Sequence, residues 1–182
     1  MADVPSTRFA VFLRGINVGK VRVPMAQLRA LATGLGASDP KTWLNSGNLA
    51  VDWPGDADSL GNALEPALTK SFGYEAHVIV RRLDDLAALV EACPFPPDDD
   101  FHAYAVLFPS ATDASAYAAA APGPTLDGEQ IERGPAPVDD VIFWRCPKGH
   151  TTDSAFGNAQ GRGAVTARPT SRNIRTIAKM VG

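Results

Sequence analysis

The order of the predicted elements places this chain in the α+β class, as a tandem pair of ferredoxin-like (βαββαβ) subdomains packed into one compact unit. First, strand, helix, strand, strand, helix and strand follow one another over residues 8–82. Second, the same order returns over residues 83–182, with little sequence identity between the halves. Third, Phe9–Leu13 and Ala103–Phe108, in the opening strands of the two halves, are apolar at every position, so both faces of each sheet must be covered. We therefore expect the halves to pack on each other or on a second copy of the chain.

Apolar spacing and turn-forming residues define the elements of the first half. Apolar side chains recur at helical spacing from Met25 to Leu35, and Pro24 suits the first turn of a helix. The segment Asn45–Asn48 has the composition of a hairpin turn. The elements expected here are a strand at Arg8–Leu13, a helix at Pro24–Leu35, strands at Thr42–Leu44 and Leu49–Trp53, a helix at Asp58–Phe72 and a strand at Ala76–Arg81.

The second half opens with a connecting helix over residues 83–92, which a proline-rich segment and an acidic run end. A basic amphipathic helix over residues 171–181 closes the chain, with Thr170 or Ser171 as its cap. Between them we expect a strand at Ala103–Phe108, a helix at Asp113–Ala121, a hairpin of Glu129–Arg133 and Val141–Cys146, a short helix near Ser154–Gln160 and a strand at Ala164–Arg168.

Composition narrows the functional classes. The 182 residues are 45% hydrophobic and 20% charged, which is typical of a soluble globular protein. No apolar run is long enough to span a membrane, and the N-terminus lacks the pattern of a signal peptide, so we expect a cytoplasmic protein. Cys93 and Cys146 are far apart in the sequence and are expected to be reduced thiols. The three histidines lack zinc-ligand spacing, so no metal and no cofactor are predicted.

Charge is unevenly distributed, although the net charge is only −3. Residues 8–48 carry six Lys and Arg against one acid, and residues 142–182 carry seven against one. The intervening residues 49–141 carry four against seventeen. Both ends of the chain are therefore basic, and an acidic protein of this kind still accommodates a site for an anion. The alternative is that the basic ends pair with the acidic middle on the folded surface.

The loop Arg14–Lys20 is the strongest candidate site. It follows an apolar strand, and its glycines expose backbone N–H groups beside two cations, which suits an anion. In the predicted topology this loop meets the turn Asn45–Asn48, because their strands are neighbours. The combined rim contains Arg14, Gly15, Asn17, Lys20, Asn45, Ser46 and Asn48. The alternative is that its glycines and asparagines only satisfy loop geometry.

Three functions remain open from these residues. In the first, the rim binds a phosphate-bearing or otherwise anionic ligand, either a nucleotide or nucleic acid. In the second, an enzyme acts on a small anionic substrate, with Arg14 as an electrostatic clamp and Ser46 or Asn17 orienting the substrate; the sequence identifies no general base and no catalytic residue. In the third, the protein is a structural or interaction protein that forms a homodimer through its apolar sheet faces. Binding ranks first and catalysis second.

Four motifs carry a resemblance to a known family. They are Phe-Leu-Arg-Gly-Ile-Asn-Val-Gly, Val-Pro-Met-Ala-x-Leu-Arg, Asn-Ser-Gly-Asn and, near the C-terminus, Thr-x-Arg-Asn. Together they resemble the DUF1697 family over residues 8–180. The resemblance implies a two-subdomain α+β build with no assigned role, and adds Arg172 and Asn173 to the candidate ligand-binding residues. Two positions differ from the family pattern, since Lys20 stands where a second glycine is usual and Ile174 where an aromatic is usual.

Overall fold

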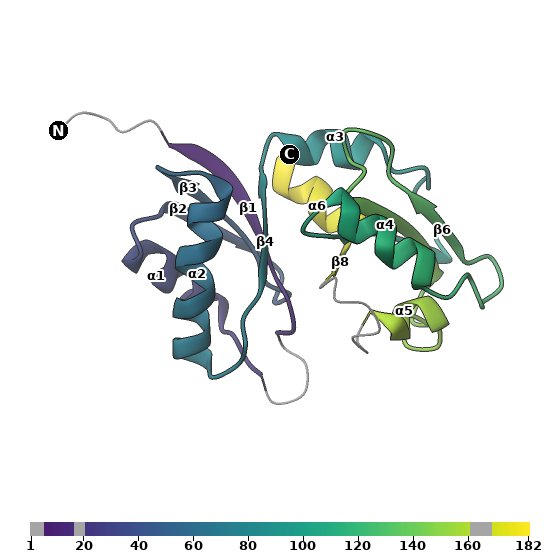
Figure 1. The fold of residues 1–182 in the computed structure, drawn as a ribbon, viewed down its shortest axis with the longest axis horizontal. Helices are drawn as coiled ribbons and strands as arrows, with labels where there is room; N and C mark the ends of the chain where they lie inside the picture. Colours follow the sequence, from purple (N-terminus) through teal and green to yellow (C-terminus); the bar gives the residue numbers. More distant parts are fainter. Residues whose placement is uncertain (1–5, 17–20, 161–168) are drawn as a thin grey trace. The chain divides into compact units, whose positions relative to one another are not determined.

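The computed structural model describes residues 6–16, 21–160 and 169–182, which form two α+β units, each built on a four-stranded antiparallel sheet (Figure 1). The first unit comprises the described residues up to 86 together with 179–182, and the second comprises those from 87 to 178. The strand order is β2-β3-β1-β4 in the first sheet and β6-β7-β5-β8 in the second. The same order in both sheets confirms the predicted tandem pair of ferredoxin-like folds.

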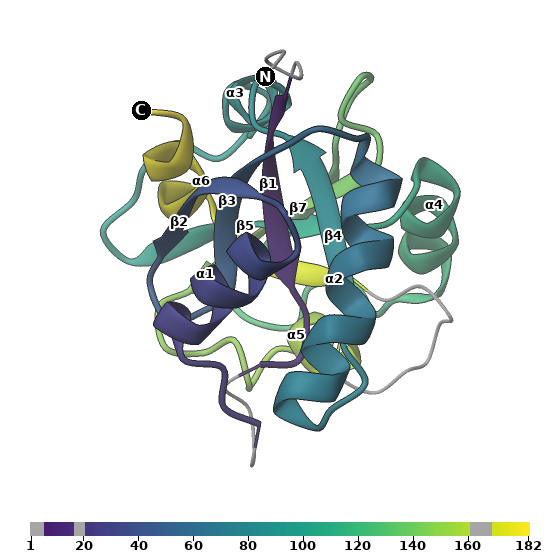
Figure 2. The ribbon, with the colours of Figure 1, turned by 90° about the vertical axis from the view of Figure 1, so that its left-hand side faces the viewer.

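In the first unit, β1 is one of the two inner strands, between β3 and β4, and α1 and α2 cover one face of the sheet (Figures 1 and 2). The apolar side chains of β1 that face the helices are buried against leucines of α1 and α2. These contacts supply the hydrophobic core of this unit. Its elements are β1 (Thr7–Leu13), α1 (Met25–Gly34), β2 (Ser38–Trp43), β3 (Asn48–Trp53), α2 (Ala57–Phe72) and β4 (Val78–Arg82).

Helix α2 continues through Pro66, although proline ordinarily interrupts a helix. The Asp56 carboxylate caps the helix by accepting a hydrogen bond from the Ser59 N–H at 2.8 Å, and Gly73 ends it with a φ of 69°. Every fourth residue from Leu60 to Leu68 is completely buried. Burial of this stripe offsets the loss of one backbone hydrogen bond at the proline.

Strand β2 begins four residues earlier than expected and ends at Trp43, so Leu44 belongs to the following turn. Its pairing with β3 is interrupted by a register shift between Ser38 and Lys41. Pro40 lies within this interruption, where it costs no ladder hydrogen bond because β2 is an edge strand.

The remaining elements of the chain follow the predicted order. The core of the second unit is a group of aromatic rings from β5, α4, β7 and α5, with Trp144 and Phe156 in contact at 5.5 Å between ring centroids. The elements are α3 (Asp85–Glu91), β5 (Phe101–Leu107), α4 (Ala111–Ala120), β6 (Gln130–Arg133), β7 (Val141–Pro147), α5 (Ala155–Ala159), β8 (Thr170–Asn173) and α6 (Ile174–Val181).

The prediction of a helix over residues 171–181 was wrong at its start. Residues Thr170–Asn173 form β8, which pairs with Tyr104–Leu107 of the central strand β5, and α6 begins only at Ile174. Backbone pairing in the sheet outweighs the local helical pattern of this segment. The strand expected at Ala164–Arg168 lies outside the described residues, and β8 is the fourth strand of the second sheet.

Candidate functional site

The predicted rim of the first unit starts at the carboxyl end of β1. The Leu13 N–H donates to the Gly47 carbonyl at 2.9 Å, directly beyond the pairing of Phe12 with Asn48. This bond places the end of β1 beside the turn Leu44–Gly47 between β2 and β3. The described part of the loop, Arg14–Ile16, therefore begins at the turn, as the topology predicts.

Gly47 is required for this close approach. Its φ is +71°, a left-handed backbone conformation that residues other than glycine rarely adopt. A Cβ at this position would lie 2.6 Å from Ile16 Cδ1 and 2.8 Å from Leu13 Cβ. Ile16 is itself buried, with an exposed fraction of 8%. The turn and the loop are thus in direct contact through Ile16, and only glycine fits between them.

Asn48 stabilises the turn through hydrogen bonds of its side chain. Its side chain is fully buried, and its Nδ2 donates to the Trp43 carbonyl at 3.0 Å and to Ser46 Oγ at 2.8 Å. Because a buried amide bonded to the turn does not face solvent, Asn48 positions Ser46 rather than presenting its own nitrogen to a ligand. Sequence analysis had placed Asn48 among the residues that contact the ligand.

The groups that remain at the surface of the rim are Gly15, Asn45 and Ser46, which are exposed, and Arg14, which is half-buried. Leu44 lies beside them with 67% of its surface exposed and a φ of +56°. An exposed leucine in a left-handed conformation is strained, and strain of this kind concentrates at functional sites. The predicted rim residues Asn17 and Lys20 lie outside the described part of the chain.

Two residues that sequence analysis missed also lie at this end of the sheet. The Arg14 N–H donates to the His77 carbonyl at 2.9 Å, and the His77 ring lies 3.1 Å from the Glu75 carboxylate. On the other side, Arg29 of α1 donates to Thr42 Oγ1 at 2.6 Å, two residues before the turn. The antiparallel pairing of β1 and β4 was the signal for His77, because it brings the start of β4 to the end of β1.

Arg172 and Asn173, the candidates near the C-terminus, belong to the second unit. Arg172 is 7% exposed, and its Nη1 donates to Thr170 Oγ1 at 2.7 Å and to the Ser171 carbonyl at 2.8 Å. Burial lowers the pKa of the Arg172 guanidinium to about 10, so it remains charged at neutral pH. Its position within β8 makes it a buried cation of the second sheet.

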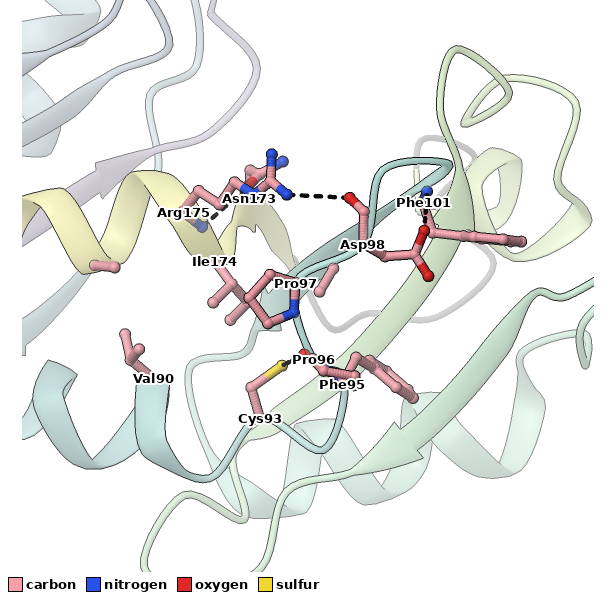
Figure 3. A pocket seen from close by; sticks show the side chains of 12 residues that line it. Val90, Cys93, Phe95, Pro96, Pro97, Asp98, Phe101, Asn173, Ile174 and Arg175 are labelled. Atoms are coloured by element: carbon pink, nitrogen blue, oxygen red, sulfur yellow. Dashed lines mark hydrogen bonds between the residues drawn. The ribbon is translucent and has the colours of Figure 1, made fainter.

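Asn173 lines a cavity of about 320 Å³ within the second unit (Figure 3). Its Oδ1 accepts a hydrogen bond from the Arg175 N–H at 2.9 Å, at the start of α6. The cavity is bounded by the end of α3, the connection to β5, the first part of β5 and the junction of β8 with α6. Its lining comprises Val90, Cys93, Phe95, Pro96, Pro97, Asp98, Phe101, Ala103, Asn173, Ile174, Arg175 and Ala178.

Two features are absent from the described ranges, a cluster of metal ligands and a membrane-spanning helix. No group of three or more His, Cys, Asp or Glu side chains there is arranged to hold a metal ion. None of the helices in the described part of the chain is long and apolar enough to cross a membrane.

Comparison with known proteins gives a family and a related fold. The sequence model of a family described as "Protein of unknown function (DUF1697)" matches residues 6–136. A solved structure, that of the conserved bacterial protein SP0830 from Streptococcus pneumoniae, is similar to this chain with a TM-score of 0.74 and 24% sequence identity. The similarity covers 97% of this chain and 98% of the other, and it supports the fold of both units. A search of curated proteins finds no match.

Proposed function

The chain belongs to the DUF1697 family of proteins of unknown function, and we propose from its geometry that it binds a phosphate-bearing or otherwise anionic ligand at the rim of its first unit. The shared chemistry is the phosphate group, carried by a nucleotide or by nucleic acid. The binding surface comprises Arg14, Gly15, Asn45 and Ser46, with Asn48 positioning the serine.

The observation that carries the proposal is the hydrogen bond from the Leu13 N–H to the Gly47 carbonyl. It brings a cation from one loop and exposed amide and hydroxyl groups from another to one end of the sheet. Arginine binds phosphate oxygens through paired N–H groups, and asparagine and serine add neutral donors. A rigid turn anchored by Asn48 holds these donors in place before the ligand arrives.

The start of α1 adds to the positive potential at this end. The helix begins at Met25 after the loop, and within the described residues it has neither a side-chain cap nor an acidic residue in its first turn. Its first N–H groups therefore keep their partial positive charge. Arg29, bonded to Thr42 near the turn, supplies a further cation.

A thermal-shift screen tests the proposal. The probes are nucleoside monophosphates and triphosphates, glucose 6-phosphate, and short RNA and DNA, each measured on the wild type and on Arg14→Ala. A probe at a hundredfold its dissociation constant stabilises the folded state by about 2.7 kcal/mol, and Arg14→Ala is expected to remove most of this gain. Binding of RNA or DNA, in contrast to a mononucleotide, is expected to weaken steeply with salt.

Arg82→Ala is the matched control. Arg82 is exposed at the opposite end of the same sheet, where it pairs with Asp84 at 3.5 Å, so its loss should leave every probe-induced shift unchanged. Equal probe-induced shifts in the wild type and in Arg14→Ala would show that the probe does not bind at the rim. The absence of any shift across all probes would refute anion binding.

The second candidate function, catalysis on a small anionic substrate, is favoured by one specific observation. His77 lies next to Arg14, and its Nε2 is within 3.1 Å of the Glu75 carboxylate. A histidine oriented by a carboxylate is a common general base, the group that the sequence did not identify. In this reading Arg14 is the electrostatic clamp, and Ser46 orients the substrate.

His77→Gln separates the two functions. If the protein is an enzyme, this change is expected to abolish turnover of any probe while the probe-induced thermal shift remains. Turnover that survives His77→Gln would exclude His77 as the base. An unchanged probe in long incubations with the wild type would leave binding as the function.

A further inference from the structure

The cavity of the second unit has the size and the lining of a small-molecule site. Its volume of about 320 Å³ lies at the lower end of the range for ligand pockets. Most of the lining is apolar, and the polar groups are gathered at one end: Figure 3 shows Arg175, Asn173 and Asp98 at that end and Val90 and Cys93 at the other. A ligand that matches this arrangement has an apolar body and one polar head.

The apolar wall is rigid. It is built from Pro96 and Pro97 in the connection to β5, with Phe95 buried behind them, and from Ile174 on the first turn of α6. Proline rings have fixed backbone φ angles, so this wall loses little conformational entropy when a ligand binds. Phe101 and Ala103 also line the cavity on the side of β5, while the ring of Phe101 points away from Ile174 and lies against Arg145, whose Cζ is 3.6 Å from the ring centroid.

Asp98 does not require a cationic ligand, because its carboxylate is already satisfied. Its Oδ2 accepts from Arg145 Nη2 at 2.9 Å, and its Oδ1 accepts from the N–H groups of Asp100 and Phe101. The hydrogen bond from Arg145 and those from the two backbone amides hold the pKa of Asp98 below its ordinary value. Asp98 therefore stays ionised and paired at neutral pH.

Arg175 is the cation that this end of the cavity offers. Its Nη2 donates to the Asp98 carbonyl at 3.0 Å, which holds the guanidinium beside the cavity. Among the described residues this is the one hydrogen bond of that guanidinium, and no carboxylate is within ion-pair distance. Since an arginine carries five N–H donors in a planar fork, the group still has donors for a planar anion.

Asn173 provides a second oriented donor. Its Oδ1 is fixed by the Arg175 N–H, so the orientation of the amide plane is set. Within the described part of the chain its Nδ2 has no hydrogen-bond acceptor, although the residue lines the cavity. A carboxylate that binds the guanidinium is the group that would also accept from this amide nitrogen.

We propose that this cavity binds a small carboxylate with an apolar body, its carboxylate on Arg175 and Asn173 and its body against Pro96, Pro97 and Ile174. This site is separate from the proposed rim of the first unit and carries a different ligand chemistry. It also gives Asn173 a role in binding through the second unit alone.

Cys93 makes the occupancy of the cavity measurable, because its thiol is part of the lining. Modification of Cys93 by N-ethylmaleimide is followed by peptide mass mapping in the full chain, which separates it from Cys146. Phenylacetate and indole-3-acetate are the probes, and phenylacetamide is the neutral analogue of the first. About tenfold protection of Cys93 is expected once the probe reaches about tenfold its dissociation constant.

Two variants identify the groups that bind. Arg175→Met keeps an unbranched apolar stem but removes the guanidinium and its charge. It is expected to weaken protection by phenylacetate about tenfold or more while leaving the weak effect of phenylacetamide unchanged. Ala178→Leu fills the cavity from α6 without changing its charge, and is expected to abolish protection by both carboxylates. Arg133→Met, an exposed arginine of β6 in the same unit, is the control and should behave as the wild type.

The proposal is overturned if neither carboxylate protects Cys93, or if phenylacetamide protects it as well as phenylacetate does. It is also overturned if Arg175→Met, folded by circular dichroism, retains full protection. The rim of the first unit is unaffected by any of these outcomes, because the phosphate probes and Arg14→Ala report on it independently.

Discussion

Replacing Glu129 with glutamine should destabilise the second unit strongly, although the two side chains have the same shape. The Glu129 carboxylate is 6% exposed and accepts four hydrogen bonds. Its Oε1 receives Trp144 Nε1 at 2.8 Å and Ser154 Oγ at 2.5 Å, and its Oε2 receives the N–H groups of Thr125 at 2.7 Å and Leu126 at 3.1 Å. These bonds join β7, the start of α5 and the loop before β6 to one carboxylate.

The expected loss of unfolding free energy in Glu129→Gln follows from the number of donors that lose their acceptor. A glutamine amide has one oxygen and one nitrogen, so two of the four donors would face an N–H₂ group instead of an oxygen. A buried donor without a partner costs about 1–3 kcal/mol, so we expect Glu129→Gln to lower the free energy of unfolding by about 4 kcal/mol. That is a large part of the stability of an ordinary domain, which is roughly 5–15 kcal/mol.

The pH dependence provides an independent test. Burial alone raises the pKa of Glu129, but the hydrogen bonds from Ser154, Thr125, Trp144 and Leu126 together lower it below its ordinary value of 4.5. Because the pKa in the folded state is below that in the unfolded chain, the stabilisation is complete above about 4.5 and is lost as the pH falls through the folded value. The difference between wild type and Glu129→Gln should therefore shrink on acidification.

Urea unfolding at pH 7 and pH 4 measures both effects. The indole N–H signal of Trp144 in a nitrogen-15 correlation spectrum reports whether its hydrogen bond to residue 129 is retained. Glu132→Gln is the control, since Glu132 is exposed on β6 three residues away and should change stability by no more than about 0.5 kcal/mol. If both variants lose the same small amount, the carboxylate is not the anchor that the four contacts indicate.

Three further predictions concern single positions. Gly47→Ala should lower the free energy of unfolding by about 2 kcal/mol or more. Gly73 is the control, because it has a similar φ of 69° but open space around it, and Gly73→Ala should cost only about 1 kcal/mol. Equal losses in the two variants would exclude the predicted clash at Gly47. Leu44→Gly should stabilise the protein by about 1 kcal/mol in the same unfolding assay by relieving its positive φ, and a loss of stability would indicate that the leucine packs against another group. Burial raises the pKa of both thiols, that of Cys146 to about 11, and Cys146 is fully buried whereas Cys93 is partly exposed. Iodoacetamide at pH 8 should therefore modify Cys93 before Cys146, as mass mapping of the two peptides would reveal.

The fold was predictable because buried side chains repeat at regular spacing along most elements. The leucines of α2 illustrate this: their one-turn spacing identified the helix despite Pro66, and all of them are buried. Strand β8 was not predictable in this way. Residues Thr170–Asn173 are polar and next to a helix-forming segment, and only the backbone pairing with β5 makes them a strand.

The candidate site was predictable at the level of topology. Neighbouring strands bring Arg14 and the turn Asn45–Asn48 together, and that inference needs no side-chain geometry. The roles of individual side chains required the structure. Asn48 is buried and bonds to its own turn. His77 was considered only as a metal ligand in the sequence, because its neighbour Arg14 is more than sixty residues away along the chain.

Comparison of the two units weakens the explanation that loop geometry alone selects the rim residues. The second sheet has the equivalent hydrogen bond at the equivalent place. The Phe108 N–H donates to the Asp140 carbonyl at 3.0 Å, as the Leu13 N–H donates to the Gly47 carbonyl in the first sheet. There, however, Pro109 follows the central strand, and the connection between β6 and β7 ends in two aspartates. The fold therefore forms this junction without an arginine or an asparagine.

Arg14, Asn45 and Ser46 are consequently not required by the topology, and their occurrence at one junction needs a separate cause. Transferring the charge of the second junction tests this: Ser46 corresponds to Asp139, so Ser46→Asp introduces the residue of the second junction, and Arg14→Ala removes the cation but keeps the N–H that donates to the His77 carbonyl. The combined variant should leave the first sheet folded. The same variant should lose every phosphate-dependent thermal shift, since it replaces a cation and a neutral hydroxyl with a methyl group and an anion. A folded variant that keeps those shifts would show that the ligand does not contact this junction.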